Sequence, residues 1–149
     1  MTDLENLYDE IHEDGIEVND FCFSKSKKAA CFKQGVYESI ILDKSKIESS
    51  VEEFCLLAEE HAHYETGTLE FITATCNMPT ARINRIIGEG KAQRHFITKH
   101  IPFKKLTADF HRFVYADGLD IYELAEHLNV TPEKAKEAIE YYHKKGFQW

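Results

Sequence analysis

The sequence predicts an α+β fold in which a short antiparallel sheet packs on a central helix and is followed by a helical C-terminal part. Residues 21–42 contain short runs rich in β-branched and aromatic residues, whereas later segments repeat apolar residues at helical spacing. With 149 residues, of which 43% are hydrophobic and 12% aromatic, the chain can bury a real core. We therefore expect a single domain over 1–149, with an N-terminal helix and small sheet (1–48), the helices of the candidate site (49–100) and C-terminal helices (101–149).

The first 48 residues predict one helix and three short strands. An amphipathic helix that ends at Gly15 is indicated by apolar residues at helical spacing, namely Leu4, Leu7, Tyr8 and Ile11. The three expected strands are Phe21–Phe23, Ala29–Phe32 and Val36–Leu42. Gln34-Gly35 is the expected hairpin turn between the second and third strands.

The stretch Val51–Gly67, VEEFCLLAEEHAHYETG, predicts the central helix. Ser49 and Ser50 can each cap its start, because a glutamate follows three residues later in both registers. Its apolar residues recur at three- and four-residue intervals, so one face should pack inward. The polar face of this helix is the densest group of acidic residues and histidines in the sequence.

Glu59 and His63 lie four residues apart on the predicted helix, so their side chains share a face and can bind one ion. Together with Glu60 they form E-E-x-x-H, which has the layout of the metallopeptidase motif H-E-x-x-H. In that motif the first and fifth residues bind zinc and the second is the general base. His61 falls on roughly the opposite side of the helix. We therefore expect it to lie in the outer shell of the metal site, without binding the ion, or at the surface. Taken alone, the pattern also fits the solvated face of an amphipathic helix.

The chain beyond the central helix predicts a loop and then a long helical stretch. Leu69–Cys76 is apolar and rich in threonine, and we expect a loop with a short helix there. Thr80–Lys99 should be largely helical, although Gly88 and Gly90 weaken the helix on either side of Glu89. Two explanations of the glycines remain open: the close approach of another element, such as a metal-carrying helix, or a break between two short helices.

The C-terminal part predicts three further helices. They are Leu106–Ala116, Ile121–Leu128 capped by Asp120, and a helix that starts at Thr131-Pro132 and ends near Lys145. The short joint between the last two is typical of a helix-turn-helix unit, whose second helix reads the DNA major groove. Charge disfavours this function, because residues 120–145 carry six acids against four lysines and DNA affinity depends on neutralising phosphates. We therefore interpret the pair as structural and expect no DNA-binding residues and no specific nucleic-acid partner.

Charge is unevenly distributed along the chain, which has a net charge of −8. Residues 82–105 carry seven basic side chains against the single acid Glu89, a local balance of +6. This basic block is either a solvated helix face or a surface for an acidic partner.

The four cysteines and the absence of long apolar runs predict the compartment. The cysteines lie 9, 24 and 21 residues apart, which matches neither a C-x-x-C zinc site nor a dense disulfide framework, so we expect reduced core residues. No apolar run approaches the length of a signal-peptide core or a membrane span. We therefore expect a cytoplasmic protein without a membrane partner.

The order and residues of these elements resemble the ImmA/IrrE-type metallopeptidases of phages and mobile elements over most of the chain. The segments that carry the resemblance are LYDEIHEDGIEV, the sheet ending in IILDKSKI, LAEEHAHYETG, EGKAQRHFITKHIPFKKL and DIYELAEHLNVTPEKAKEAIEYY. The resemblance implies a small zincin-like fold. Its third metal ligand would lie on a later helix, in a segment patterned Glu-x-x-Ala followed by aromatic and Ile-Pro residues, which Glu89 and Ala92 match.

The resemblance further implies that Glu59, His63 and Glu89 bind one divalent metal. Glu60 would then be the catalytic base, and Tyr64 or His61 would help to stabilise an oxyanion. Zn²⁺ is the metal that the resemblance implies. The sequence departs from the family at Glu59, where most members are expected to have histidine, and two carboxylates with one imidazole also suit Mn²⁺ or Fe²⁺.

The implied activity is metal-dependent hydrolysis of a specific regulatory protein, such as a phage or mobile-element repressor. The basic block at 82–105 would suit an acidic target. Glu59 motivates an alternative, a regulatory protein-binding module that has kept the zincin scaffold and lost its metal. A third alternative, a DNA-binding regulator, rests only on the C-terminal helix pair.

Overall fold

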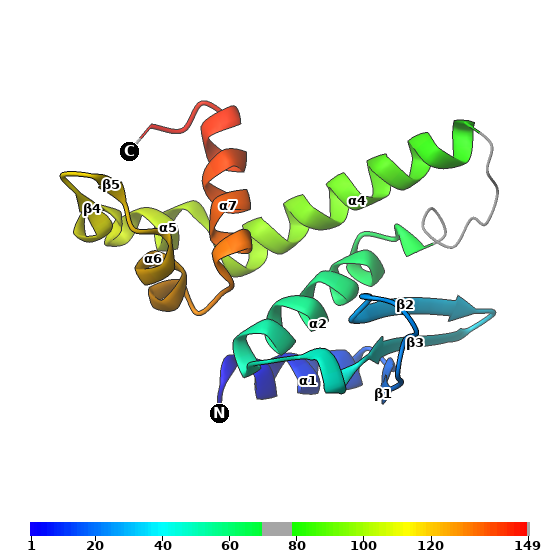
Figure 1. Ribbon diagram of the computed structural model, residues 1–149. Coiled ribbons are helices and arrows are strands. Elements are labelled where there is room, and N and C mark those ends of the chain that lie inside the picture. The colour runs from blue at the N-terminus through cyan, green and yellow to red at the C-terminus, as the bar shows by residue number, and fades with distance from the viewer. Residues whose placement is uncertain (70–78, 149) are drawn as a thin grey trace. The chain divides into compact units, whose positions relative to one another are not determined.

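The computed structural model describes residues 1–69 and 79–148, and its helices and small sheets form the α+β fold that the sequence predicts (Figure 1). The chain divides into two compact units, residues 1–93 and 94–149. The boundary falls inside helix α4 (Pro79–His100), and a single domain over 1–149 stays a prediction. Within the described residues, every helix is too short or too polar to cross a membrane.

The first unit opens with helix α1 (Asp3–Glu13), which begins at a capping box between Thr2 and Glu5. The chain reverses at Gly15, whose φ of 77° lies in the left-handed region that glycine adopts without strain. Three strands follow: β1 (Glu17–Asp20), β2 (Ala29–Gln34) and β3 (Tyr37–Leu42). The central strand β3 is antiparallel to β2 and parallel to β1, so β2 forms one edge of this sheet.

The sheet is therefore mixed, and the prediction of an antiparallel sheet starting at Phe21–Phe23 is wrong. β1 lies earlier in the chain and places Val18 opposite Ile40 in parallel register. Its sequence EVND shows no apolar alternation, because this edge strand is largely exposed and only Val18 is partly covered. Phe21 is exposed and forms no strand.

A buried carboxylate fixes the segment that follows β1. Asp43 accepts hydrogen bonds from the backbone N–H of Phe23 (2.9 Å) and from the hydroxyl of Ser45, and the ammonium of Lys46 lies 2.9 Å away. These donors, first Ser45 and then Lys46, lower the pKa of Asp43 to about 2. A short 3₁₀ turn, η1 (Lys44–Lys46), leads from here to the central helix.

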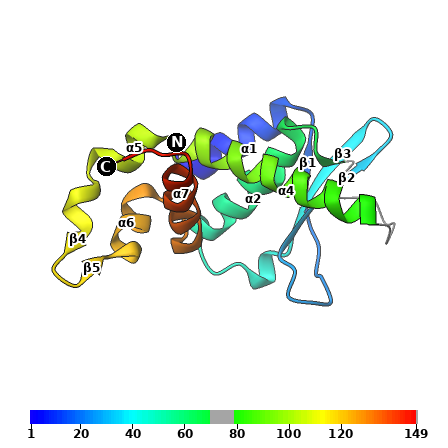
Figure 2. The same ribbon diagram turned by 90° about the horizontal axis from the view of Figure 1, so that it is seen from above.

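The central helix is α2 (Ser50–Glu65), which contacts α1 as well as β2 and β3 (Figure 2). Ser49 caps it as predicted, with its hydroxyl accepting from the backbone N–H of Glu52 at 3.1 Å. The buried side chains of α2 include Phe54, Cys55, Leu57 and Ala58. A satisfied N-terminus and a buried apolar stripe explain why this helix could be predicted from local sequence.

Helix α4 runs unbroken from Pro79 to His100, so the predicted alternative of two short helices separated at Gly88 and Gly90 is wrong. Gly88 is buried in the continuous helix. The loop predicted at Leu69–Cys76 lies outside the described residues from residue 70 onward.

The cysteine prediction is confirmed in part. Cys31 and Cys55 are buried and free, whereas Cys22 is exposed and so not a core residue, and Cys76 lies outside the described part of the chain. Cys22 is the second residue after the exposed end of β1.

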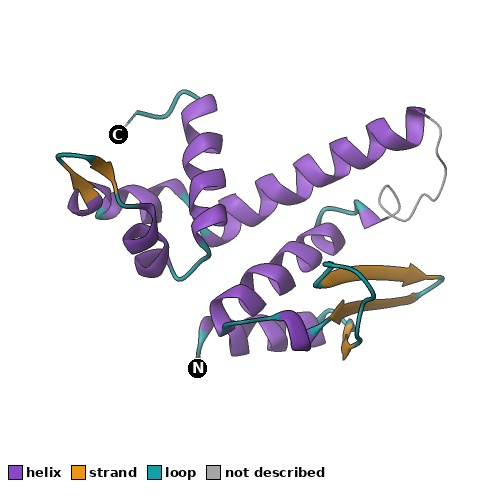
Figure 3. Ribbon diagram, in the orientation of Figure 1, coloured by secondary structure: helices purple, strands orange, loops and turns teal. Residues whose placement is uncertain are grey.

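The second unit begins with the end of α4 and continues through short helices and a small two-stranded sheet (Figure 3). In chain order they are α5 (Phe103–Ala108), η2 (Phe110–Phe113), β4 (Val114–Tyr115), β5 (Gly118–Leu119), α6 (Ile121–Leu128) and α7 (Pro132–Lys144). The predicted helix Leu106–Ala116 is wrong in extent. α5 ends at Ala108, because Asp109 leaves helical geometry with a φ of −126°, and Val114–Tyr115 instead pairs with Gly118–Leu119.

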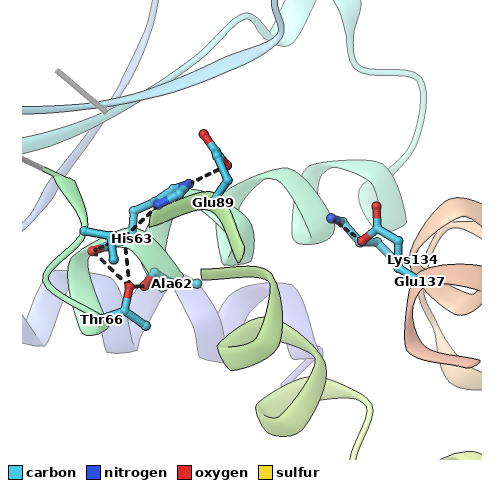
Figure 4. Close-up of polar contacts among 7 residues, drawn as sticks. Ala62, His63, Thr66, Glu89, Lys134 and Glu137 are labelled. Atoms are coloured by element: carbon cyan, nitrogen blue, oxygen red, sulfur yellow. Dashed lines mark hydrogen bonds and ion pairs between the residues drawn. The ribbon is translucent and has the colours of Figure 1, made fainter. Parts of the chain in front are cut away.

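The last two helices begin where the sequence predicts. Asp120 accepts from the N–H groups of Tyr122 and Glu123, and Thr131 accepts from that of Lys134. Lys134 is itself buried: its ammonium lies 5.1 Å from the ring centre of Phe96 and 2.9 Å from Glu137 (Figure 4).

Candidate functional site

A cavity of about 1130 Å³ in the first unit is lined by the three predicted metal ligands and the predicted general base. Glu59, Glu60 and His63 reach it from α2, and Glu89 reaches it from α4. The other side is formed by β2, β3, the end of β1 and the segment that follows it. The remaining charged and aromatic residues in the lining are Asp20, Phe21, Lys27, Phe32, Lys33, Tyr37 and Arg85.

The side chain of His63 is held by a chain of hydroxyl groups at the end of α2 (Figure 4). Nδ1 of His63 lies 2.9 Å from Oγ1 of Thr68, which lies 2.9 Å from Oγ1 of Thr66. Thr66 donates its proton to the carbonyl oxygen of Ala62 at 2.7 Å. When Thr68 donates to Thr66 or to the carbonyl of His63, its oxygen can accept from Nδ1–H. This network is compatible with the tautomer that carries the proton on Nδ1 and a lone pair on Nε2.

In that tautomer the lone pair on Nε2 faces a carboxylate. Nε2 of His63 lies 3.4 Å from Oε2 of Glu89, and the side chain of His63 is only 4% exposed, whereas that of Glu89 is 53% exposed. Two electron-rich atoms facing each other are stabilised by a proton or by a cation between them. The structure therefore brings together two of the three predicted ligands, which come from separate helices.

Glu59 is half-buried and lines the same cavity, one helical turn before His63. Glu60 is also half-buried, and burial raises its pKa to about 7. The negative charges of Glu59 and Glu89 act in the same direction, whereas His63 and Lys27 oppose the shift. A carboxyl group that titrates near neutral pH can exchange protons with a substrate, which is what a general base requires.

The donors at this cavity fit a divalent cation. The imidazole of His63 and the carboxylates of Glu59 and Glu89, which line the same cavity, are ligand types that zinc, manganese and iron accept. The hydroxyl of Thr68 takes the outer-shell place that commonly orients metal-binding histidines.

His61 and Tyr64 do not line this cavity. His61 is fully buried on the side of α2 that faces α1, and its Nε2 lies 2.7 Å from Oδ2 of Asp14. The ring of Tyr64 stacks on that of His61, with the ring centres 5.8 Å apart and the planes 8° from parallel. A role of either residue in stabilising an oxyanion stays a prediction, and the contacts of both point elsewhere.

Sequence reasoning missed two features of α2. The first is Thr68, whose only local signal is its place five residues after His63 at the end of the helix. The second is a group on the opposite face that could hold a metal ion: ligand atoms of Glu10, His61 and Glu65 all lie within 4.8 Å of one another. The His61–Glu65 spacing was visible in the sequence, but the contribution of Glu10 from α1 depends on tertiary packing.

Comparison with known proteins adds nothing to this geometry, since no protein family, no curated protein and no solved structure matches the chain.

Proposed function

We propose that this protein is a metal-dependent endopeptidase of the ImmA/IrrE type, with a zincin-like fold, that cleaves a specific regulatory protein such as a phage or mobile-element repressor. The observation that carries the proposal is the approach of Nε2 of His63, with its lone pair, to the carboxylate of Glu89 in the cavity that Glu59 and Glu60 also line. The resemblance described from the sequence supplies the reaction type and the class of substrate.

In this proposal Glu59, His63 and Glu89 hold one divalent metal, preferably Zn²⁺, with Mn²⁺ or Fe²⁺ as alternatives. When bound, such a metal supplies a nucleophilic water at neutral pH and polarises the scissile carbonyl. His63 is oriented for binding by Thr68 before any metal arrives. Three protein ligands leave a coordination position for water or substrate.

Glu60 is the general base in this proposal. Its neighbour Glu59 binds the metal, whereas Glu60 transfers protons. A pKa of about 7 lets Glu60 take a proton from the attacking water and give it to the leaving amine, because both directions of transfer are then accessible at neutral pH.

The walls of the cavity suit an extended peptide. β2 lies at the edge of its sheet, and its residues from Ala30 to Gln34 line the cavity. An edge strand offers backbone N–H and C=O groups to a peptide that adds as a further strand. The basic side chains of Lys27, Lys33 and Arg85 in the lining favour an acidic segment in the substrate.

Two adjacent substitutions test the proposal. Glu60→Gln should abolish cleavage of a repressor encoded next to this protein, with a loss on the order of a hundredfold or more, and leave metal content intact. Glu59→Gln should instead lower metal affinity, because a neutral amide is a poorer ligand than a carboxylate. Glu13→Gln, at an exposed position of α1, is the matched control that should change neither property.

The result against the proposal is equally specific. If the parent protein binds that repressor tightly but cuts it with none of Zn²⁺, Mn²⁺ and Fe²⁺, the chain is a regulatory binding module. Cleavage by Glu60→Gln at the parental rate would remove Glu60 from the mechanism.

A further inference from the structure

The face of α2 opposite the cavity carries a second histidine with its own carboxylate partners. His61 is 0% exposed, and its Nδ1 is buried and makes no hydrogen bond within residues 1–69 and 79–148. The carboxylate oxygen Oε1 of Glu65 lies 3.2 Å from this nitrogen but outside hydrogen-bonding geometry. A buried ring nitrogen without a hydrogen bond costs free energy unless something else binds it.

The other nitrogen of the ring determines what Nδ1 can bind. Nε2 of His61 lies 2.7 Å from Oδ2 of Asp14, and a carboxylate accepts the proton that Nε2 carries. In the neutral ring Nδ1 then holds a lone pair, directed toward the carboxylate group of Glu65. This carboxylate–histidine pair has the arrangement that orients histidines toward metal ions.

The spacing of the three groups fits one small cation. Zn²⁺ binds nitrogen and oxygen at about 2.1 Å, so two ligand atoms of a tetrahedral site lie roughly 3.4 Å apart. The 3.2 Å between His61 and Glu65 already meets this spacing. Glu10 of α1 brings a third ligand atom, and all three lie within 4.8 Å of one another. Rotation of the half-buried Glu10 side chain can close the remaining gap.

We propose that Glu10, His61 and Glu65 form a second divalent-cation site that joins α1 to α2 on the face opposite the cavity. Asp14 is its positioning residue and acts through the ring of His61. The site is structural: it binds a cation between two helices that form the core of the first unit, and it lies away from the residues assigned to hydrolysis. It does not depend on the proposed peptidase function.

Metal stoichiometry in matched variants tests this site. The full-length chain is stripped of metal with a chelator and titrated with Zn²⁺ against a chromophoric competitor. His63→Ala removes a ligand of the cavity site, and Glu89→Gln gives a second background that alters only a largely exposed side chain. In either background one strong Zn²⁺ equivalent should remain and should raise the melting temperature.

Conservative substitutions in the His63→Ala and Glu89→Gln backgrounds then test the second site. Glu10→Gln and Glu65→Gln should each weaken the remaining equivalent at least tenfold, and Asp14→Ala should weaken it roughly 10–100-fold. Glu13→Gln, on the same helix as Glu10, should leave it unchanged. Unchanged Zn²⁺ affinity after both Glu10→Gln and Glu65→Gln would overturn the proposal.

The same titration separates this site from the proposed peptidase centre. Loss of one equivalent with His63→Ala and of another with Glu65→Gln supports both sites. A single equivalent that Glu65→Gln removes and His63→Ala retains would support the second site and contradict the metal centre of the proposed function.

Discussion

Nε2 of His63 lies 3.4 Å from Oε2 of Glu89, although the two residues come from different helices and are far apart in the sequence. The contact is directional, because the hydroxyl of Thr68 holds the other ring nitrogen of His63 at 2.9 Å. A lone pair that faces a carboxylate inside a cavity is the physical basis of the proposed metal centre.

Removal of the hydroxyl that orients His63 should weaken the metal centre without removing a ligand. Thr68→Val keeps the size of the buried side chain but cannot accept from Nδ1–H, so we expect zinc affinity at this site to fall about 10–100-fold. Thr98→Val is the matched control, since its hydroxyl donates to backbone carbonyls of α4. Competition titration measures the zinc affinity of both variants. Equal affinities would show that Thr68 does not position the imidazole ring of His63.

Asp43 should make the folded state sensitive to acid. Its pKa is about 2 in the folded protein against 3.8 ordinarily, so the folded state holds the ionised form more strongly than the unfolded chain does. The stabilisation is complete above pH 3.8 and is lost as pH falls toward 2. Asp43→Asn should therefore lower the free energy of unfolding at neutral pH, and its difference from the parent should shrink between pH 4 and pH 2.

Denaturant titrations at several pH values measure this effect. Asp117→Asn, at an exposed turn position, serves as the control for loss of a charge. If the difference in the free energy of unfolding between Asp43→Asn and the parent stays constant down to pH 2, the ionised Asp43 is not the source of the acid sensitivity.

The buried Lys134 should stabilise the second unit. Lys134→Met keeps the apolar stem but loses the contacts of the ammonium with the Phe96 ring and Glu137, so we expect a loss of about 1–2 kcal/mol in the free energy of unfolding. Lys136→Met, exposed on the same helix, should change it by less than about 0.5 kcal/mol. Indistinguishable unfolding curves for the two variants would mean that the buried charge contributes nothing.

The helix pair α6–α7 should not bind DNA specifically. Its net negative charge opposes phosphate contacts, so titration of the full chain against candidate operator fragments at physiological salt should give only weak binding. Binding well below about 1 µM with a preference for one sequence would contradict the charge argument, because nonspecific contacts seldom reach that affinity.

Elements with strong local signals could be predicted from the sequence. The helices that begin at Ser49, Asp120 and Thr131 have side-chain caps, and their apolar stripes are buried as the spacing indicates. The four residues of the proposed catalytic centre also reach one cavity. Helical spacing was sufficient for Glu59, Glu60 and His63, whereas the placement of Glu89 came from the resemblance.

Features that depend on contacts between distant segments could not be predicted. β1 is a strand because it pairs with β3, and its own residues carry no strand pattern. The residues after α5, which ends at Ala108, include a strand that pairs with β5, and this pairing could not be predicted from local spacing. The partnership of Glu10 with His61 likewise arises only when α1 packs on α2.

The most direct test of the peptidase centre is a crystal structure of the full chain grown with saturating Zn²⁺, with anomalous difference density recorded at the zinc edge. We predict a peak about 2.0–2.2 Å from Nε2 of His63 and from carboxylate oxygens of Glu59 and Glu89, with Glu60 facing it but not bound. A map with no zinc at His63, in which its imidazole still contacts Glu89 directly, would contradict the account.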